Sequence, residues 1–316
     1  MKRKAIMPAL VLSVSLVGCG TESAKGAPGV GSQTPPPIGP VATITSVDQI
    51  VRPVDRYLVT PQQVTTIQSA ANILNEKCMK EFGLRGVATE LFGFDAKSIR
   101  YDRTHAPLYG FFDPAQAGTS GYDRIPSQPA PAPSGAVPPS MDTMTVEHGM
   151  DSAGNPVSTF AGKSLPVGGC KGQSVRGTGG ALPMPDPKAL PDHGPQIPTD
   201  DPRILKVTAA WSACMKSKGF TYSNPQDALD NPQLIPKTSE RNGVISVQHS
   251  ADELKQASAD VACKLSTNMV GISLAVQSAY DTRYVEGHTQ ALREYSQRIE
   301  SRVREAARIS NEEAKD

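Results

Sequence analysis

Residues 77–84 read KCMKEFGL, and residues 213–220 read ACMKSKGF. Each stretch holds Cys-Met-Lys, two further residues, a glycine and a bulky apolar residue. This ending is typical of a helix whose last turn closes on a left-handed glycine, after which the apolar residue packs back. We therefore predict that both stretches are helix C-termini. The closing residues are Gly83 and Leu84 in the first copy, and Gly219 and Phe220 in the second.

The residues before each copy have the spacing of an amphipathic helix. Apolar residues recur there at three- and four-residue steps, which places them on one face. Before the second copy, Asp201 is suited to the N-cap and Pro202 to the first helical position. The predicted buried stripes are Val64, Ile67, Ala71, Leu74, Cys78 and Phe82 in the first helix, and Ile204, Val207 and Trp211 in the second.

The order of the cysteines indicates how they pair. Each Cys-Met-Lys phrase is followed later by a Cys-Lys, in VGGCKG at Cys170 and in DVACKL at Cys263. The order favours two related halves, each closed by its own disulfide: Cys78–Cys170 and Cys214–Cys263. Loops of roughly 90 and 50 residues would each stabilise the fold by up to about 4–5 kcal/mol in the chain-entropy model.

A zinc site is the alternative use of four cysteines. Zinc sites usually contain close pairs such as Cys-x-x-Cys, and redox-active pairs have the same spacing. These four cysteines are all far apart in the sequence. No local signature supports a nucleophilic cysteine either. We predict no metal site and no cofactor.

The N-terminus has the pattern of a bacterial lipoprotein signal. Residues 1–4 read MKRK, and a short apolar run leads to Leu16-Val17-Gly18-Cys19. The run is too short to span a bilayer comfortably but suits a signal peptide. We expect cleavage before Cys19, a diacylglycerol-type (palmitate-bearing) anchor on its thiol, and residence at the extracytoplasmic face of the cell membrane. An ordinary secretory signal is the alternative.

The composition limits the partners and divides the chain. The net charge is +1, and removal of Lys2, Arg3 and Lys4 makes it −2, so nucleic acid is not an expected partner. The 28 prolines and 27 glycines are clustered in stretches that bury little apolar surface. We predict a signal peptide at 1–18, a lipidated flexible tether at 19–59, a first half at 60–180, a Pro-rich linker at 181–200 and a second half at 201–316.

The segment between the two helix ends concentrates the aromatic residues. It can form an aromatic ligand pocket with basic residues, or a loop-rich cap that packs on the first helix, and we favour the cap. Residues 144–167 alternate around DSAGN, which predicts a small β-hairpin. The segment's residues are Phe92, Phe94, Tyr101, Tyr109, Phe111, Phe112 and Tyr122, with Arg100, Arg103 and His105 interleaved.

Motifs of catalysis are not found in the sequence. The five histidines form no metal-binding pattern, and no nucleophile elbow occurs. Glu147-His148 is the most enzyme-like pair, and we interpret it as an exposed turn because adjacent strand residues point to opposite faces. We therefore predict a protein that is not an enzyme.

The C-terminal region predicts a long helix. Ser250 to Glu253 form a capping-box pattern, and Gly271 and Gly287 weaken the helical pattern without ending it. In the last part, the apolar period is near that of a coiled coil. We predict that its far end contacts a second copy or another envelope protein. Folding back on the protein's own first helix is equally open. The proposed contact residues are Leu292, Tyr295, Ile299 and Val303.

The chain resembles a family of uncharacterised actinobacterial lipoproteins. The resemblance rests on the lipobox, CMKEFG, YGFFDPAQAGTSGYD, PVGGCKG, CMKSKGFTYSNPQDA, and ADVACK leading into a long helix. It implies the membrane location and the disulfide pairing argued above, and it supplies no activity, substrate or site. The Pro-rich middle departs from the family pattern.

Together these features predict a mainly α protein: disulfide-stapled helices, a small β-hairpin, long Pro/Gly-rich loops and a long C-terminal helix. The expected function is that of a non-enzymatic, membrane-anchored lipoprotein that binds a partner protein or ligand at the cell envelope. One alternative is an envelope hydrolase acting on cell-wall or peptide substrates through His105 and Glu147/His148. Another is an accessory lipoprotein of an exporter.

The lipobox predicts the effect of one substitution. Cys19→Ala should abolish lipid labelling and lipoprotein processing, because the thiol is the acceptor of the diacylglycerol. Metabolic labelling with a fatty acid, followed by membrane fractionation, measures both. A variant that is still labelled and fully membrane-bound would contradict the assignment.

Overall fold

The computed structural model describes residues 34–86, 103–124, 139–241 and 244–314. The chain divides into two compact units, Met1–Pro35 and Pro36–Asp316, and the second contains nearly all of the described residues. The signal peptide, Cys19, Phe92, Phe94, Arg100 and Tyr101 lie outside the described residues.

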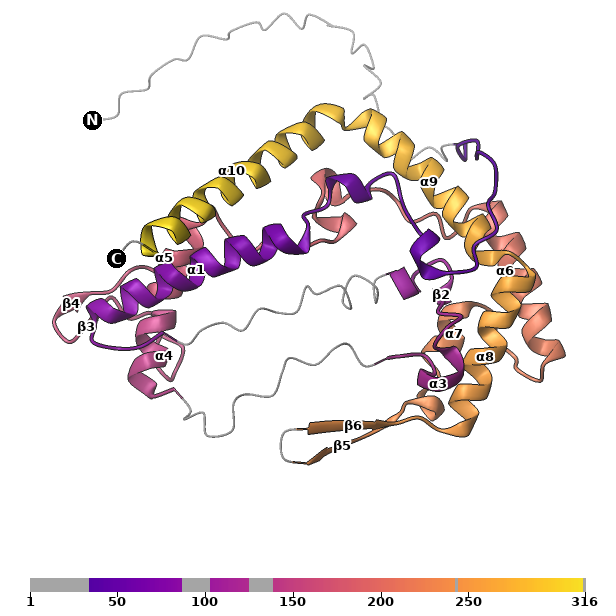
Figure 1. The fold of residues 1–316 in the computed structure, drawn as a ribbon, viewed down its shortest axis with the longest axis horizontal. Helices are drawn as coiled ribbons and strands as arrows, with labels where there is room; N and C mark the ends of the chain where they lie inside the picture. Colours follow the sequence, from indigo (N-terminus) through magenta and orange to yellow (C-terminus); the bar gives the residue numbers. More distant parts are fainter. Residues whose placement is uncertain (1–33, 87–102, 125–138, 242–243, 315–316) are drawn as a thin grey trace, which may run out of the picture. The chain divides into compact units, whose positions relative to one another are not determined.

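The second unit is mainly helical, as predicted (Figure 1). Its helices are α1 (Pro61–Glu81), α3 (Ala117–Ser120), α4 (Met141–His148), α5 (Gly169–Gly177), α6 (Pro202–Ser217), α7 (Pro225–Leu229), α8 (Ala251–Ser266), α9 (Met269–Gly287) and α10 (Thr289–Glu313). Its antiparallel two-stranded sheets are β1 (His105–Ala106) with β2 (Gly110–Phe111), β3 (Thr159–Phe160) with β4 (Lys163–Ser164), and β5 (Lys237–Arg241) with β6 (Val244–Gln248).

The repeated phrase forms the same helix ending twice. Gly83 has a φ of 73° and Gly219 a φ of 89°, which is the left-handed region. In α1 the Leu84 N–H donates to the Met79 carbonyl at 3.0 Å, and the same bond joins Phe220 to Met215 after α6. Both methionines are fully buried. The two endings are Schellman motifs, which confirms the prediction.

The disulfides are those predicted from the order of the cysteines. Cys78 is bonded to Cys170, which ties α1 to α5. Cys214 is bonded to Cys263, which ties α6 to α8. Each bond therefore fixes the C-terminal end of one helix against a second helix.

The first and last helices pack against each other. Leu292 near the start of α10 shares a core cluster with Val64 near the start of α1. Farther along, Ala306 clusters with Ile67, and Lys77 forms an ion pair with Glu313 at 2.8 Å. The two helices are therefore parallel, and the halves at 60–180 and 201–316 share one compact unit.

This packing corrects the proposed interaction surface. Leu292, Tyr295 and Ile299 are buried in the chain's own core, with exposed fractions of 0%, 9% and 7%, and Val303 is half-buried beside them. The stripe is thus covered by α1 and the residues before it. The apolar period correctly predicts a stripe that needs covering. The period alone does not say which surface covers the stripe.

The long C-terminal helix is divided into three. Asn268 has a φ of 50° and separates α8 from α9. Gly287 is the last residue of α9, and His288 lies between α9 and α10. The prediction that Gly287 would not end the helix is therefore wrong, whereas Gly271 does lie inside α9. Shorter helices let the chain follow the core, which an unbroken rod cannot do.

The hairpin predicted at 144–167 is only partly correct. Its first half is helix α4, because the Ser140 hydroxyl caps the helix by accepting from the Thr143 N–H at 3.1 Å. Thr159–Phe160 and Lys163–Ser164 form the observed hairpin. Glu147 lies on α4 and is buried, so it is not an exposed turn residue.

Two segments expected to be extended lie on the core instead. Within the predicted tether, Ile44, Ile50 and Val54 are buried. Within the predicted linker at 181–200, Leu190 is buried in the cluster that contains Leu292. Prolines do not prevent a segment from burying the apolar side chains between them.

The α1–α10 packing predicts a stability effect. Leu292→Ala should lower the free energy of unfolding by about 2–5 kcal/mol, because it removes a fully buried side chain and leaves a cavity. Urea denaturation of the oxidised protein measures the change.

The neighbouring Arg293 is exposed and is the matched control, for which Arg293→Ala should change stability by less than about 0.5 kcal/mol. If Leu292→Ala had an effect as small as the control, the stripe would not be core.

Candidate functional site

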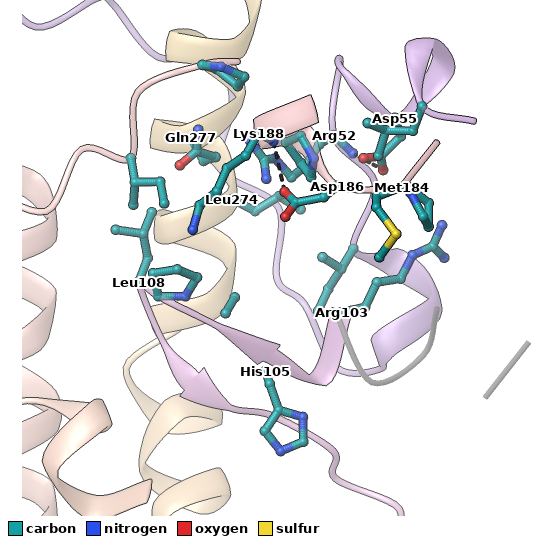
Figure 2. Close-up of a pocket in the computed structure, with 18 of the residues that line it drawn as sticks. Arg52, Asp55, Arg103, His105, Leu108, Met184, Asp186, Lys188, Leu274 and Gln277 are labelled. Carbon is teal, nitrogen blue, oxygen red and sulfur yellow. Dashed lines mark hydrogen bonds between the residues drawn. The ribbon is translucent and has the colours of Figure 1, made fainter. Parts of the chain in front are cut away.

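The candidate site is a cavity of about 710 Å³. Its walls come from four parts of the chain: residues 50–61, the β1–β2 turn, residues 184–197 and one face of α9. Figure 2 shows side chains from these walls directed around a common space. A volume of roughly 300–1,000 Å³ is usual for a small-molecule site.

One face of α9 holds two of these walls in place. Asp281 accepts two hydrogen bonds from the Arg52 guanidinium, at 2.8 and 2.9 Å. Gln277 donates to the Gln196 carbonyl at 3.1 Å, and Tyr284 donates to the Pro191 carbonyl at 2.6 Å. Residues four and three apart share a helix face. The same face therefore anchors both the 50–61 segment and the Pro-rich segment.

The segment before residue 50 is anchored at the break between α8 and α9. The Asn268 amide donates to the Ala42 carbonyl at 3.0 Å and accepts from the Ile44 N–H at 3.4 Å. A Cβ on Gly271 would lie 2.1 Å from the Ala42 carbonyl oxygen. Only glycine permits this close approach, so the helix break and the glycine together seat the segment.

The β1–β2 turn is held rigid by its own polar groups. The Tyr109 hydroxyl donates to the Arg103 carbonyl at 2.6 Å, and burial raises the pKa of Tyr109. The two ring nitrogens of His105 lie 2.8 Å from the Thr104 hydroxyl and 2.8 Å from the Tyr122 carbonyl. Both nitrogens of His105 are therefore engaged in positioning the wall.

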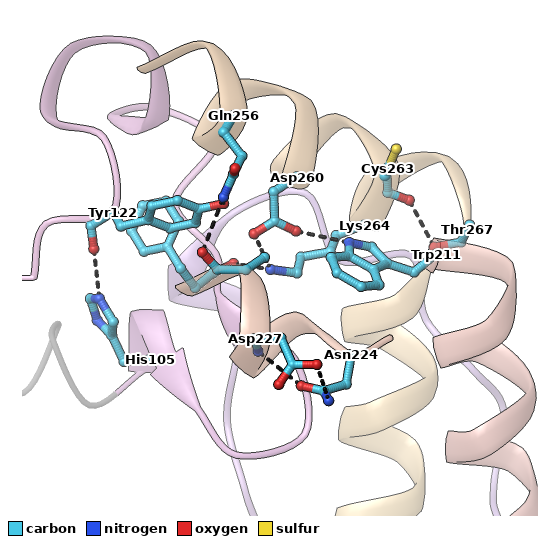
Figure 3. Close-up of polar contacts among 12 residues, drawn as sticks. His105, Tyr122, Trp211, Asn224, Asp227, Gln256, Asp260, Cys263, Lys264 and Thr267 are labelled. Atoms are coloured by element: carbon cyan, nitrogen blue, oxygen red, sulfur yellow. Dashed lines mark hydrogen bonds and ion pairs between the residues drawn. The ribbon is translucent and has the colours of Figure 1, made fainter. Parts of the chain in front are cut away.

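A buried ion pair fixes this wall to the helices behind it (Figure 3). The Lys264 ammonium donates to the Phe111 carbonyl of β2 at 2.6 Å and to the Asp260 carboxylate at 2.7 Å. The Trp211 indole of α6 donates to the same carboxylate at 2.8 Å. Trp211, Asp260 and Lys264 are all buried. The group joins α6, α8 and β2 at one point.

Burial acts on both charges of this pair. It raises the pKa of Asp260 and lowers the pKa of Lys264, while the attraction between them acts in the opposite direction on each. All of the polar atoms involved have hydrogen-bond partners, and none opens into the cavity at 50–61. The pair is therefore a structural anchor, and it is not a candidate for chemistry.

Most of the cavity surface is apolar, but polar and charged residues from all four walls also line it: Arg52, Asp55, Thr60, Arg103, His105, Tyr109, Asp186, Lys188, Ser273 and Gln277. The Ser273 hydroxyl is buried and has no hydrogen-bond partner within the described residues. Among the described residues, no hydrogen-bond or ion-pair partner is found for the Lys188 ammonium or the Arg103 guanidinium. Figure 2 shows these two cations on different sides of Asp186. The apolar lining residues are Ile50, Leu58, Val59, Pro61, Ala106, Pro107, Leu108, Met184, Pro185, Pro187, Pro195, Ile197 and Leu274.

The residues considered for catalysis are not brought together. Glu147 accepts a hydrogen bond from Asn75 of α1 at 3.1 Å, inside the packing of α1 against α4. His105 belongs to the β1–β2 wall. Figure 1 shows α4 and β2 well separated. His148 lies in the last turn of α4 and not beside His105.

The aromatic segment fulfils both interpretations in part. Phe111, Phe112 and Tyr122 are buried in the largest core cluster of the described residues, as expected for a cap. That cluster includes residues of α6, α8 and α9 and none of α1, so the prediction that the cap packs on the first helix is wrong. The segment's Arg103, His105 and Tyr109 line the cavity, as expected for a pocket with basic residues. The same turn therefore packs into the core and forms one wall of the cavity.

Several lining residues were missed by the sequence analysis. Ser273 and Gln277 lie in a helix for which the sequence analysis considered only the apolar residues. Lys188 lies in a segment that was interpreted as a linker. The usable signal was the polar residues at helical spacing on α9. Gln277 and Tyr284 on this face donate to backbone carbonyls, which leave no sequence signature.

Within the described residues, no group of three or more His, Cys, Asp or Glu side chains could hold a metal ion. None of the helices in the described ranges is both long and apolar enough to cross a membrane. No family model, curated protein or solved structure matches this chain.

The buried ion pair predicts a large stability effect. Lys264→Met should cost about 3–5 kcal/mol of unfolding free energy, because it leaves the Asp260 carboxylate buried without its cation. Urea denaturation gives the value. On the same helix, Lys255 is exposed, and Lys255→Met should be nearly neutral. Equal effects of the two variants would refute the anchoring role.

Proposed function

We propose that this protein is a membrane-anchored, extracytoplasmic lipoprotein of non-enzymatic type that binds a small ligand at the cell envelope. The anchor is proposed from the lipobox at Cys19, and the ligand site is the cavity between residues 50–61, the β1–β2 turn, residues 184–197 and α9. Two disulfides suit an oxidising compartment.

The observation that carries the ligand-binding proposal is the composition of the cavity. An apolar space with a few polar groups is the usual form of a small-molecule site. Here Lys188 and Arg103 line the cavity, and no hydrogen-bond or ion-pair partner is found among the described residues for either cation. Groups of this kind orient a ligand that apolar walls cannot orient.

A ligand is supported better than a partner protein. The apolar stripe that would have met a partner, around Leu292 and Ile299, is covered by α1. The hydrolase alternative lacks a comparable support, because Glu147 and His105 take part in separate packing regions.

Native mass spectrometry of the protein released gently from the envelope tests the proposal. The wild type should carry a bound small molecule. Met184 lines the cavity and is 50% exposed, so Met184→Trp should partly fill the mouth without disturbing the core. We expect this variant to lose most of the bound molecule.

Met141→Trp is the matched control. Met141 is 59% exposed and lies at the start of α4, outside the residues that line the cavity. This variant should retain the ligand. The proposal fails if the wild type carries no bound molecule from any extract, or if both tryptophan variants lose it equally.

A further inference from the structure

We propose that α4 and the residues directly after it bind a soft monovalent metal ion, Cu(I). The ligands are the thioether sulfurs of Met144 and Met150 and the imidazole of His148, with Met141 as a further thioether. These residues lie outside the lining of the cavity, so the proposal does not depend on the ligand-binding function.

The methionines of the described residues differ sharply in exposure. Three are fully buried, as is usual for an apolar side chain: Met79, Met215 and Met269. Three others are gathered within residues 141–150 and are exposed: Met141 at 59%, Met144 at 38% and Met150 at 48%. A single exposed apolar side chain needs no explanation, whereas a group of them around one histidine indicates a function.

The helix places three of the proposed ligands on one face. At about 100° per residue, Met141, Met144 and His148 fall within an arc of about 60°. Neighbours three and four residues apart have Cβ atoms about 5–6 Å apart. The buried residues of α4, Val146 and Glu147, lie on the opposite side. The methionines and the histidine therefore share the solvent-facing side of the helix.

The end of α4 brings the fourth residue close. Gly149 is left-handed, with a φ of 67°, and its N–H donates to the Thr145 carbonyl at 2.8 Å. Met150 follows directly, and a chain of two residues spans at most about 7 Å, which limits its distance from His148. A methionine side chain is unbranched and has three rotatable bonds, so its sulfur can adjust to an ion beside the imidazole.

The imidazole is available, and its helix is held in place. His148 is half-buried, and within the described ranges it has no hydrogen-bond or ion-pair partner. On the other side of α4, Val146 packs in the cluster that contains the Cys78–Cys170 disulfide, and Glu147 accepts from Asn75 at 3.1 Å. A site on a fixed helix holds its ligands more precisely than a site on a loop.

The donor set selects the ion. Thioethers and imidazole suit Cu(I), whereas magnesium, calcium and manganese prefer oxygen ligands. Among the neighbouring carboxylates, Glu147 is bonded to Asn75, and Asp151 accepts from N–H groups of its own loop. Asp142 lies about 100° around the helix from Met141. Thioethers are a donor type outside the His, Cys, Asp and Glu clusters that the described residues lack.

The cysteines do not compete for such an ion. The four cysteines of the described residues are bonded in two disulfides, and a thiolate is needed to bind a metal. A thioether forms no disulfide, so it is the sulfur ligand that persists beside them in an oxidising compartment.

Competition for Cu(I) with the chromogenic chelator bicinchoninate tests the site. The mature full chain, with both disulfides intact, is titrated without oxygen in the presence of ascorbate. The wild type should withdraw a single Cu(I) per chain from the chelator. Proton NMR should show the methyl signals of Met144 and Met150 shifting in step with this binding.

Met144→Leu and Met150→Leu separate sulfur chemistry from apolar character, because leucine keeps the size and removes the thioether. Each should weaken Cu(I) binding about tenfold or more, as should His148→Gln, since loss of a ligand costs at least as much as loss of a group that supports one. Met184→Leu is the matched control, because Met184 is also exposed, at 50%, but lines the cavity. It should bind Cu(I) like the wild type.

Three results would overturn the proposal. The first is a wild type that leaves all Cu(I) with the chelator, and the second is leucine variants that bind Cu(I) as tightly as the wild type. The third is tighter binding of Zn(II) than of Cu(I) that only His148→Gln removes, which would indicate an imidazole site without thioethers. None of these results affects the bound molecule sought with Met184→Trp, so the two proposals fail separately.

Discussion

The buried ion pair between Lys264 and Asp260 connects the elements that form the largest core cluster of the described residues. The ammonium of α8 holds the Phe111 carbonyl of β2, and the carboxylate holds the Trp211 indole of α6. Three elements from distant parts of the chain thus meet at one point. Charges at such depth are tolerated only when every group is paired, so this geometry admits little alternative packing.

The disulfides and the helix breaks connect the elements around this ion pair to the rest of the chain. Cys214–Cys263 lies on the same two helices as the ion pair, and Cys78–Cys170 fixes the distant end of α1. The break at Asn268 precedes α9, and one face of α9 binds two irregular segments, one through the Arg52 guanidinium and the other through the Gln196 and Pro191 carbonyls. Those segments become the walls of a cavity because a regular helix face holds them.

The cavity is thus a consequence of how loops rest on helices. Its rigid wall is the β1–β2 turn, which is bonded on one side to α8 and presents Leu108 and His105 on the other. Under the proposed function, a ligand would meet a surface already ordered by the fold. Preorganisation of this kind lowers the cost of binding, because the walls lose little freedom when the ligand arrives.

The local features of this protein could be predicted from its amino-acid sequence. The Cys-Met-Lys phrases, with Gly83 and Gly219, predicted both helix endings, and the order of the cysteines predicted both disulfides, because turn chemistry and pairing leave local signatures. Three features became visible only in the folded chain: Leu292 packs against α1, the Pro-rich segment forms a wall, and Ser273 lies at the cavity. These depend on which distant surfaces meet, and an apolar period or a backbone carbonyl does not name its partner.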